Sequence, residues 1–313
     1  MTLIKTIRFI LISARPSQWL KNVILFGAAF LAGNLFDPQT FLRVTAGFVV
    51  FCIVSSAMYI FNDVMDREKD RLHPVKKHRP IASGKLSPII ALISCVIFLA
   101  IAFPLSFKLS HYFFLVVFAY VVLQLAYSSF LRDVIIIDAL TIALGFIFRV
   151  FAGALVVPVS ISSWLVLTTI GLSLLMAFGK RRSERTLLEV QGQTFDARAA
   201  LRDYPDTLLD SAISTFSAFT ILSYSLFAFQ TSPTASAFQE LLPSILAKPK
   251  WMLLTVPVVI YGVTRYLYVI YEKKEGESPA EVLLSDVPLL LSVLCWALAV
   301  WVIVYVLGGN DLF

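Results

Sequence analysis

Residues 88–106 read PIIALISCVIFLAIAFPLS, an apolar run without a charged side chain. A helix needs about 20 apolar residues to span the hydrocarbon core of a bilayer. Comparable runs follow one another along the chain, and charged residues make up only 15% of the 313 residues. A soluble domain carries about a quarter charged residues. The sequence therefore predicts an all-α integral membrane protein.

We expect about nine transmembrane helices, in a single polytopic domain over residues 1–313. The predicted spans are residues 20–36, 41–61, 88–106, 112–131, 134–157, 162–179, 208–230, 251–271 and 287–307. Pro88 and Pro288 suit the first turns of their helices, where the missing N–H costs little. The three cysteines lie singly in apolar runs, a pattern that indicates neither a disulfide framework nor a zinc site.

Basic residues are distributed unevenly between the two sides of this topology. With a cytoplasmic amino terminus, the basic residues left on the outer side are Arg43, Lys108, Lys248 and Lys250. This is the positive-inside distribution of a multi-pass protein, here of a bacterial-type plasma membrane. The odd number of spans then places the carboxyl terminus outside. Most of the charge falls in two long cytoplasmic loops, residues 62–87 and 180–207.

The first long loop opens with three carboxylates on one helical face. Asp63, Asp66 and Asp70 lie within about 60° of one another on a helix, and Tyr59 and Asn62 flank the Asp66 side. Carboxylates at this spacing repel one another unless a cation lies between them. Mg²⁺ characteristically takes one or two carboxylates and shares its other positions with substrate phosphates. The alternative is a solvated helix end whose acids pair with nearby basic residues, namely Arg67, Lys69 and Arg71.

A dense basic segment follows, with the sequence HPVKKHRPIASGK at residues 73–85. Its prolines break the helix, and Gly84 permits a close approach of the backbone. Lys76 supplies a point charge and Arg79 a planar fork, which are the two usual ways to hold a phosphate. A basic loop that only faces lipid would explain the charge but not the acids before it. The loop therefore predicts a metal–phosphate site.

These motifs resemble those of a known family. The pattern N-D-x-x-D-x-x-x-D from Asn62 to Asp70, followed by H-P-x-K-x-x-R-P-I-A-S-G, resembles the UbiA superfamily of intramembrane prenyltransferases. The opening R-P-S-Q-W-L-K-N at residues 15–22 is similar to its branch of decaprenyl-phosphate phosphoribosyltransferases. Further matches are Tyr127 to Arg132, Arg149 with Ala152-Gly153, Gly179-Lys180-Arg181 with Glu184, and Arg265-Tyr266. The family usually has Lys where this chain has Arg132, which keeps the charge but changes the donor geometry.

The resemblance implies a Mg²⁺-dependent glycosyltransferase that moves 5-phosphoribosyl from 5-phosphoribosyl 1-diphosphate to a decaprenyl-type polyprenyl phosphate. Diphosphate is released, in the synthesis of cell-wall arabinan precursors. Asp63 and Asp66 would be catalytic and would hold the metal together with Asn62 and Asp70. The implied substrate-binding residues are Lys21, Tyr59, Lys76, Arg79, Tyr127, Arg132, Arg149, Lys180, Arg181 and Glu184. No nucleic-acid partner is expected, and the sequence leaves open whether the protein forms a homo-oligomer.

Two charged residues lie inside the predicted fifth span. Charges within a membrane are costly and usually face a cavity, so Asp138 and Arg149 are candidates for function. Thr141, Gly145 and Ala152 share their helical face, and a face that is polar and small is typical of a cavity lining. Arg149 either forms an ion pair with a neighbouring helix or holds a substrate phosphate at depth.

The second long loop begins with KRRSER at residues 180–185. Members of the superfamily that use prenyl diphosphates carry a second aspartate-rich metal motif in this loop, where this chain is basic. Asp203, Asp206 and Asp210 nevertheless repeat the spacing of the first motif. They form either the acidic amino terminus of a helix, where the helix dipole favours them, or a second metal site.

Two other functions stay open from the sequence. The first is prenyl transfer from a prenyl diphosphate to an aromatic or other acceptor. The second is transport of a phosphorylated solute, for which inverted repeats and broken helices would be typical. Neither feature is evident, and an odd number of spans prevents two equal halves. The net charge of +6 fits anionic substrates and an anionic inner leaflet.

Overall fold

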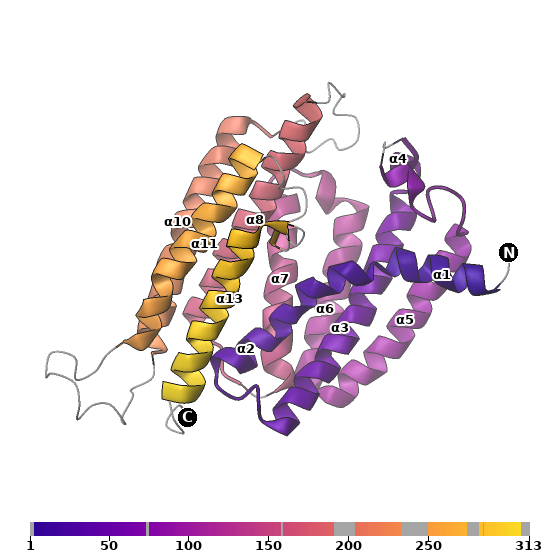
Figure 1. Ribbon diagram of the computed structural model, residues 1–313. Coiled ribbons are helices and arrows are strands. Elements are labelled where there is room, and N and C mark those ends of the chain that lie inside the picture. The colour runs from indigo at the N-terminus through magenta and orange to yellow at the C-terminus, as the bar shows by residue number, and fades with distance from the viewer. Residues whose placement is uncertain are drawn as a thin grey trace, which may run out of the picture. The chain divides into compact units, whose positions relative to one another are not determined.

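The structure of the chain is a computed structural model, shown in Figure 1. It describes residues 3–72, 75–157, 159–190, 204–232, 250–273, 282–283 and 285–307. Every regular element within these ranges is a helix, which confirms the predicted all-α class. The chain divides into two compact units. Residues 3–26 and 39–157 belong to the first, and residues 27–38 with those described from 159 onward, including residue 204, belong to the second. The single domain expected from the sequence stays a prediction.

The first unit holds most of the amino-terminal half of the chain. Its helices are α1 (Leu3–Ala14), η1 (Pro16–Leu25), α3 (Pro38–Met65), α4 (Arg67–Leu72), η2 (Lys76–His78), α5 (Pro88–Leu109), α6 (His111–Ser129), η3 (Leu131–Asp133) and α7 (Ile137–Val156). Arg15, between α1 and η1, has a φ of 51°, which is uncommon for a residue other than glycine. The chain changes direction there, and Pro16 opens the 3₁₀ helix η1.

The second unit holds the carboxy-terminal helices, of which Figure 1 shows α10, α11 and α13 running side by side. Its elements are α2 (Phe26–Leu31), α8 (Ser163–Val190), α10 (Asp206–Gln230), η7 (Trp251–Thr255), α11 (Val256–Tyr268), η8 (Val269–Lys273), α13 (Val287–Trp301) and η9 (Val302–Leu307). The helices α8 and α10 pack closely, and the rings of Phe178 and Phe216 stack with their centroids 5.6 Å apart.

Eight helices in the described ranges are long and apolar enough to cross a membrane. They are Pro38–Met65, Pro88–Leu109, His111–Ser129, Ile137–Val156, Ser163–Thr186, Asp206–Gln230, Trp251–Glu272 and Val287–Leu307. These eight correspond to the second through the ninth predicted spans. Pro88 and Pro288 both lie in the first turns of their helices, as expected.

The first predicted span, residues 20–36, is different. It is divided between the 3₁₀ helix η1, the six-residue helix α2 and turns. Gly33 follows α2 with a φ of 78°, a left-handed conformation that a continuing right-handed helix does not contain. The expectation of a regular helix there was wrong, because counting apolar residues does not reveal the left-handed turn that ends the helix.

Both predicted loops begin with helix. Around Asp66 the backbone continues the helical pattern, since Asp66 N donates to the oxygen of Asn62 at 2.9 Å and Asp70 N to that of Asp66 at 2.8 Å. Asp63 lies near the end of α3, Asp66 at the turn between α3 and α4, and Asp70 in α4. In the second loop, α8 continues to Val190. The loop predicted over 180–207 thus begins later than expected, because polar helix formers extend a helix beyond its apolar span.

The backbone of η1 lies directly against α7. A Cβ atom placed on Gly153 would lie 2.0 Å from the carbonyl oxygen of Leu25, and Leu25 itself is fully buried. Only a residue without a side chain allows this approach, since a clash with backbone cannot be relieved by a rotamer change.

We predict that Gly153→Ala lowers the stability of the protein by about 3 kcal/mol or more, because η1 and α7 must move apart. Gly27→Ala is the matched control, since a Cβ at Gly27 meets nothing within 4 Å. Thermal unfolding of the purified proteins in detergent measures both. Equal melting temperatures for the two variants would contradict the close contact.

Candidate active site

The acidic motif is held by arginines that come from separate segments of the first unit. Asp63, near the end of α3, is 2% exposed. Arg15 Nη2 contacts its Oδ1 closely, and Arg79 Nη1 donates to the same oxygen at 3.1 Å. The same Arg79 nitrogen donates to Asp70 Oδ2 at 2.7 Å. One guanidinium nitrogen therefore bridges Asp63 and Asp70, and their oxygens lie no farther apart than the sum of these two distances.

Asp66 points to a different set of partners. Arg132, in η3, forms a close ion pair with Asp66 Oδ1 through Nη1. Asn62 Nδ2 donates to Asp66 Oδ2 at 3.0 Å, and Ser128 Oγ donates to Asn62 Oδ1 at 3.1 Å. These contacts connect the acidic motif to the end of α6. The sequence predicted Arg132 as a phosphate ligand, and the structure brings it to the acid in the middle of the motif.

The carboxylates of Asp63 and Asp70 are ligands of the type that a hard cation prefers. Within the described ranges, no three Asp, Glu, His or Cys side chains approach closely enough to form a metal site. Asp63 and Asp70 are nevertheless both buried and both contact one cationic nitrogen. Such a pair offers carboxylate oxygens of the kind that a divalent ion prefers, whereas Asp66 and Asn62 contact Arg132 and Ser128. The ligand set expected from the sequence stays a prediction.

The other residues predicted to bind the donor lie around this motif in the chain. The guanidinium of Arg15 lies over the ring of Tyr59, 5.3 Å from its centroid. Lys21 lies in η1, Lys76 in η2 and Tyr127 in α6. His73 and Pro74 lie outside the described residues. Arg15 belongs to the sequence motif at residues 15–22, but no pattern in the sequence indicated that it contacts Asp63.

Arg149 is buried in α7, with 5% of its surface exposed. Its Nε donates to Asn22 Oδ1, its Nη1 to the carbonyl oxygen of Gly145 and its Nη2 to Tyr120 Oη, each at 2.8 Å. All three of these partners are neutral. Within the described part of the chain, Arg149 forms no ion pair with an acid, so the expected alternative of an interhelical ion pair is not found there.

The neutral partners of Arg149 are themselves fixed by α3. Asn22 is fully buried, and its Nδ2 lies 3.1 Å from Ser55 Oγ and 3.4 Å from Cys52 Sγ. The ring of Tyr120 packs against that of Phe51 at 5.1 Å between centroids. Sequence reasoning missed the role of Tyr120, because a single tyrosine in an apolar run carries no recognisable signal.

The basic start of the second loop is helical and lies in the second unit. Lys180 Nζ lies 3.7 Å from Glu184 Oε1, and Arg181 Nη1 lies 2.7 Å from Glu184 Oε2. Lys180 and Glu184 are thus an i, i+4 pair on α8. Arg181 is the more deeply placed of the two cations, with a side chain only 2% exposed.

The second group of acids is engaged by arginines. Asp206 lies in the first turn of α10, which confirms the interpretation of an acidic helix amino terminus for that residue. Arg185 Nε lies 3.0 Å from Asp206, and Arg182 Nε donates to Asp210 at 3.0 Å. Tyr271 Oη also donates to Asp210, at 2.8 Å. Asp203 lies outside the described residues.

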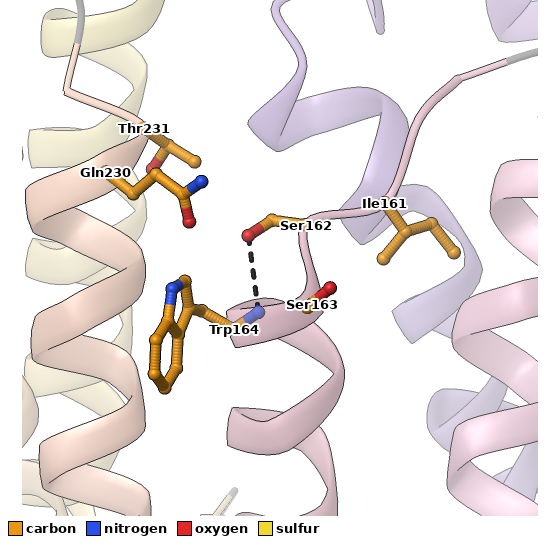
Figure 2. Close-up of a pocket in the computed structure, with 6 residues that line it drawn as sticks. All are labelled: Ile161, Ser162, Ser163, Trp164, Gln230 and Thr231. Carbon is orange, nitrogen blue, oxygen red and sulfur yellow. Dashed lines mark hydrogen bonds between the residues drawn. The ribbon is translucent and has the colours of Figure 1, made fainter.

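Figure 2 shows a pocket in the second unit. Its volume is about 610 Å³, and its lining residues are Ile161, Ser162, Ser163, Trp164, Gln230 and Thr231. The backbone N–H of Trp164 donates to Ser162 Oγ at 3.3 Å, as Figure 2 shows. The pocket lies at the amino-terminal end of α8, about 25 Å along the helix from Lys180. It contains none of the predicted site residues.

Comparison with known proteins assigns the family. Residues 23–285 match the sequence profile of the UbiA prenyltransferase family. The chain belongs to this family. It is 33% identical to the decaprenyl-phosphate phosphoribosyltransferase of Corynebacterium glutamicum over 94% of this chain and 86% of that protein. The protein of the same name from Mycolicibacterium smegmatis is 30% identical, over 91% of this chain and 88% of the relative.

Solved structures support the fold. A UbiA homologue from Archaeoglobus fulgidus bound to GPP and Mg²⁺ is similar with a TM-score of 0.67 and 18% identity, covering 95% of this chain and 99% of that one. A digeranylgeranylglyceryl phosphate synthase structure gives a TM-score of 0.64 at 17% identity, over 96% of this chain and 99% of the other. This UbiA-family protein is therefore a multi-pass integral membrane transferase.

We predict that the Arg79 bridge in this UbiA-family protein is a coupled interaction. In a double-mutant cycle of Asp63→Asn and Arg79→Gln, the coupling in the free energy of unfolding should be about 2 kcal/mol, since each single variant leaves a buried charge without its partner. The control is Glu68→Gln, whose partner Arg71 is exposed and which should change stability by less than about 0.5 kcal/mol. Additive effects of the two site variants would show that the bridge is not formed.

Proposed function

We propose that this UbiA-family protein transfers 5-phosphoribosyl from 5-phosphoribosyl 1-diphosphate to a polyprenyl phosphate of decaprenyl type, with release of diphosphate. The observation that carries the proposal is the similarity, at about 30% identity over nearly the whole chain, to proteins named decaprenyl-phosphate phosphoribosyltransferase. The same stretch of this chain contains both the acidic motif and the basic segment after it. The cytoplasmic position of these loops rests on the distribution of basic residues and stays a prediction.

The proposed chemistry requires little acid–base catalysis. An oxygen of the lipid phosphate attacks C1 of the ribose, and the bond from C1 to the diphosphate oxygen breaks. The attacking oxygen is already anionic at neutral pH, so no strong general base is needed. The requirements are the placement of two anionic substrates and the stabilisation of the departing diphosphate. Such a reaction suits a site built from carboxylates, arginines and lysines.

The first unit supplies groups suited to the donor. Mg²⁺ bound by Asp63 and Asp70, with Asn62 and Asp66 beside them, would neutralise charge on the diphosphate. A guanidinium has five N–H donors, and only one nitrogen of Arg79 is used to bridge the two acids. Arg79 can therefore hold a diphosphate oxygen and stay near Asp63. Lys21, Tyr59 and Lys76 are proposed to help position the same donor.

Arg149 is suited to an anionic group at depth in the membrane. Its three hydrogen-bond partners fix the guanidinium without neutralising it, and a buried charge is strongly destabilising unless an opposite charge is near. The phosphate of a lipid substrate would supply that charge. Arg132, Lys180 and Arg181 are the other proposed phosphate ligands, and Tyr127 and Glu184 the proposed supporting residues.

Prenyl transfer is the alternative that the family name suggests. A second metal site in the second loop would favour it. The described aspartates of the first turns of α10, Asp206 and Asp210, contact Arg182 and Arg185. The acids of the first loop are paired with arginines in the same way, so these ion pairs do not distinguish the two donors. The preference for the phosphoribosyl donor rests on the similarity to the named relatives.

The two donors can be compared directly. Purified protein with Mg²⁺ and a polyprenyl phosphate is incubated with labelled 5-phosphoribosyl 1-diphosphate, and in parallel a labelled prenyl diphosphate is supplied with an aromatic acceptor. We expect label to enter the lipid fraction only from the phosphoribosyl donor, together with stoichiometric diphosphate. Lipid-linked product from the prenyl donor alone would refute the proposal.

The acidic motif should be required for this activity. We predict that Asp63→Asn, Asp66→Ala and Asp70→Asn each reduce turnover by about a hundredfold or more, because the metal loses a carboxylate ligand. Glu68→Gln is the matched control, since the Glu68 side chain is 73% exposed and pairs with Arg71. Chelation should abolish wild-type activity, and added Mg²⁺ should restore it. Normal activity of Asp66→Ala in the presence of chelator would exclude the metal.

Arg149 should act on the lipid substrate. We predict that Arg149→Lys raises the KM for polyprenyl phosphate by about tenfold and leaves the KM for the donor nearly unchanged, because a lysine cannot keep the three-way hydrogen bonding of the fork. Arg8→Lys, at an exposed position of α1, serves as the control. A selective rise in the KM for the donor would reassign Arg149 to the other substrate.

A further inference from the structure

Two buried hydroxyl groups in the second unit lack a hydrogen-bond partner among the described residues. They are Tyr266 Oη on α11 and Ser183 Oγ on α8. Tyr266 is 7% exposed and Ser183 is fully buried. Buried hydroxyls in native proteins are nearly always bonded to protein, water or ligand. Other buried hydroxyls in this unit follow that rule, since Ser217 and Thr220 donate to carbonyl oxygens of their own helix at 2.7 and 2.6 Å.

The two hydroxyls lie at the same end of the unit, next to its basic cluster. A Cβ atom on Gly179 would lie 3.1 Å from Tyr266 Oη and 2.6 Å from the side chain of Ile270. The tyrosine hydroxyl therefore reaches the surface of α8 where the side chain is missing. Ser183 follows Gly179 by four residues, which places it one turn further along nearly the same face of α8.

The intervening residues supply positive charge. Lys180 and Arg181 lie between Gly179 and Ser183 in the chain, and both contact the one carboxylate of Glu184. This turn of α8 therefore carries cations close to the two hydroxyls. A nearby cation favours an anionic acceptor for the hydroxyl protons over a neutral one, and a hydrogen bond from a hydroxyl to an anionic oxygen is roughly twice as strong as a neutral one.

We infer that Tyr266 and Ser183 donate hydrogen bonds to a phosphate monoester of a substrate, held beside Lys180. The inference rests on the proposed function, in which both substrates carry such a group: the donor has a 5-phosphate and the acceptor a lipid phosphate. Gly179 makes the site possible, because any side chain there would displace Ile270 and approach the tyrosine hydroxyl. Neither Tyr266 nor Ser183 need take part in bond breaking, so both are binding residues.

Kinetics of Tyr266→Phe and Ser183→Ala test the inference and identify the phosphate. Each variant should raise the KM for one substrate by about tenfold, with kcat nearly unchanged, because uniform binding is lost. A rise for 5-phosphoribosyl 1-diphosphate assigns the 5-phosphate, and a rise for the polyprenyl phosphate assigns the lipid. Unchanged KM values for both substrates in both variants would overturn the inference.

Two matched controls separate this effect from general damage to the fold. Tyr271→Phe removes a tyrosine hydroxyl that is bonded to Asp210, and Ser217→Ala removes a buried serine hydroxyl that is bonded within its helix. Neither should raise either KM more than about twofold, since neither group is proposed to contact substrate. A rise in KM in the controls equal to that in the site variants would also overturn the inference.

Thermal unfolding provides a readout that does not depend on turnover. Without ligand, Tyr266→Phe should melt no lower than wild type, because the hydroxyl that it removes has no partner to lose. With 5-phosphoribosyl 1-diphosphate or polyprenyl phosphate added singly, the rise in melting temperature seen for wild type should shrink in the variant. A lower melting temperature without ligand and an undiminished ligand shift would mean that the hydroxyl binds structural water.

Thermal unfolding also tests the phosphate site independently of the proposed phosphoribosyl transfer. If the wild-type protein transfers no phosphoribosyl group, the proposed function fails, and the binding arm then uses ribose 5-phosphate as the probe. Stabilisation by ribose 5-phosphate that weakens in Tyr266→Phe and Ser183→Ala would still support a phosphate monoester site. Equal stabilisation of the variants and wild type, or none of any of them, would overturn it.

Discussion

Compensation of buried carboxylates by arginine governs the arrangement of the first unit. Asp63 and Asp70 are almost fully buried, and an isolated carboxylate in that environment would be strongly destabilising. Arg79 contacts both of them, while Arg15 contacts Asp63 and Arg132 contacts Asp66. These arginines come from three separate segments: the junction of α1 and η1, the turn after η2, and η3. These ion pairs thereby help to determine the positions of the three segments relative to α3.

A buried charge of the opposite sign also determines which groups meet around α7. Arg149 is a cation buried among neutral donors and acceptors, and its position depends on Asn22, Tyr120 and the backbone of Gly145. Gly153, one turn further along α7, lets the backbone of η1 approach closely enough for Asn22 to reach the guanidinium. A small residue and a buried charge on one helix thus cooperate. Gly153 permits the close approach of η1, and the Arg149 guanidinium then donates to Asn22 Oδ1 on that segment.

In the second unit, charge and hydroxyl groups gather at one end of α8. Arg182 and Arg185 contact the acids of α10, and Lys180 and Arg181 contact Glu184. The unsatisfied hydroxyls of Tyr266 and Ser183 lie beside the second pair. The pocket at the other end of the helix has no charged residue in its lining. These contacts underlie the proposal that the Lys180 end of α8 binds an anionic group of a substrate.

The sequence alone determined the features that depend on local composition. The free energy of transferring a segment into lipid depends on the composition of that segment alone. Eight of the nine predicted spans are accordingly helices of spanning length in the described residues. The motifs identified the family, and the spacing of Asp63 and Asp70 predicted that both lie in helical segments, as they do in α3 and α4. The first span was misjudged, because the left-handed turn at Gly33 is a backbone property that hydropathy does not record.

Only the tertiary structure decided which groups meet. Asn22 and Arg149 are separated by 127 residues in the chain, and Asn62 and Ser128 by 66. Neither pairing follows from any local pattern, because a hydrogen bond depends on the positions of two segments and not on the composition of either. The same reason explains why Arg79 could be predicted as a phosphate ligand but not as the bridge between Asp63 and Asp70. It also explains why the sequence did not indicate that the hydroxyls of Ser183 and Tyr266 lie at the same end of the second unit, since this depends on how α8 and α11 pack.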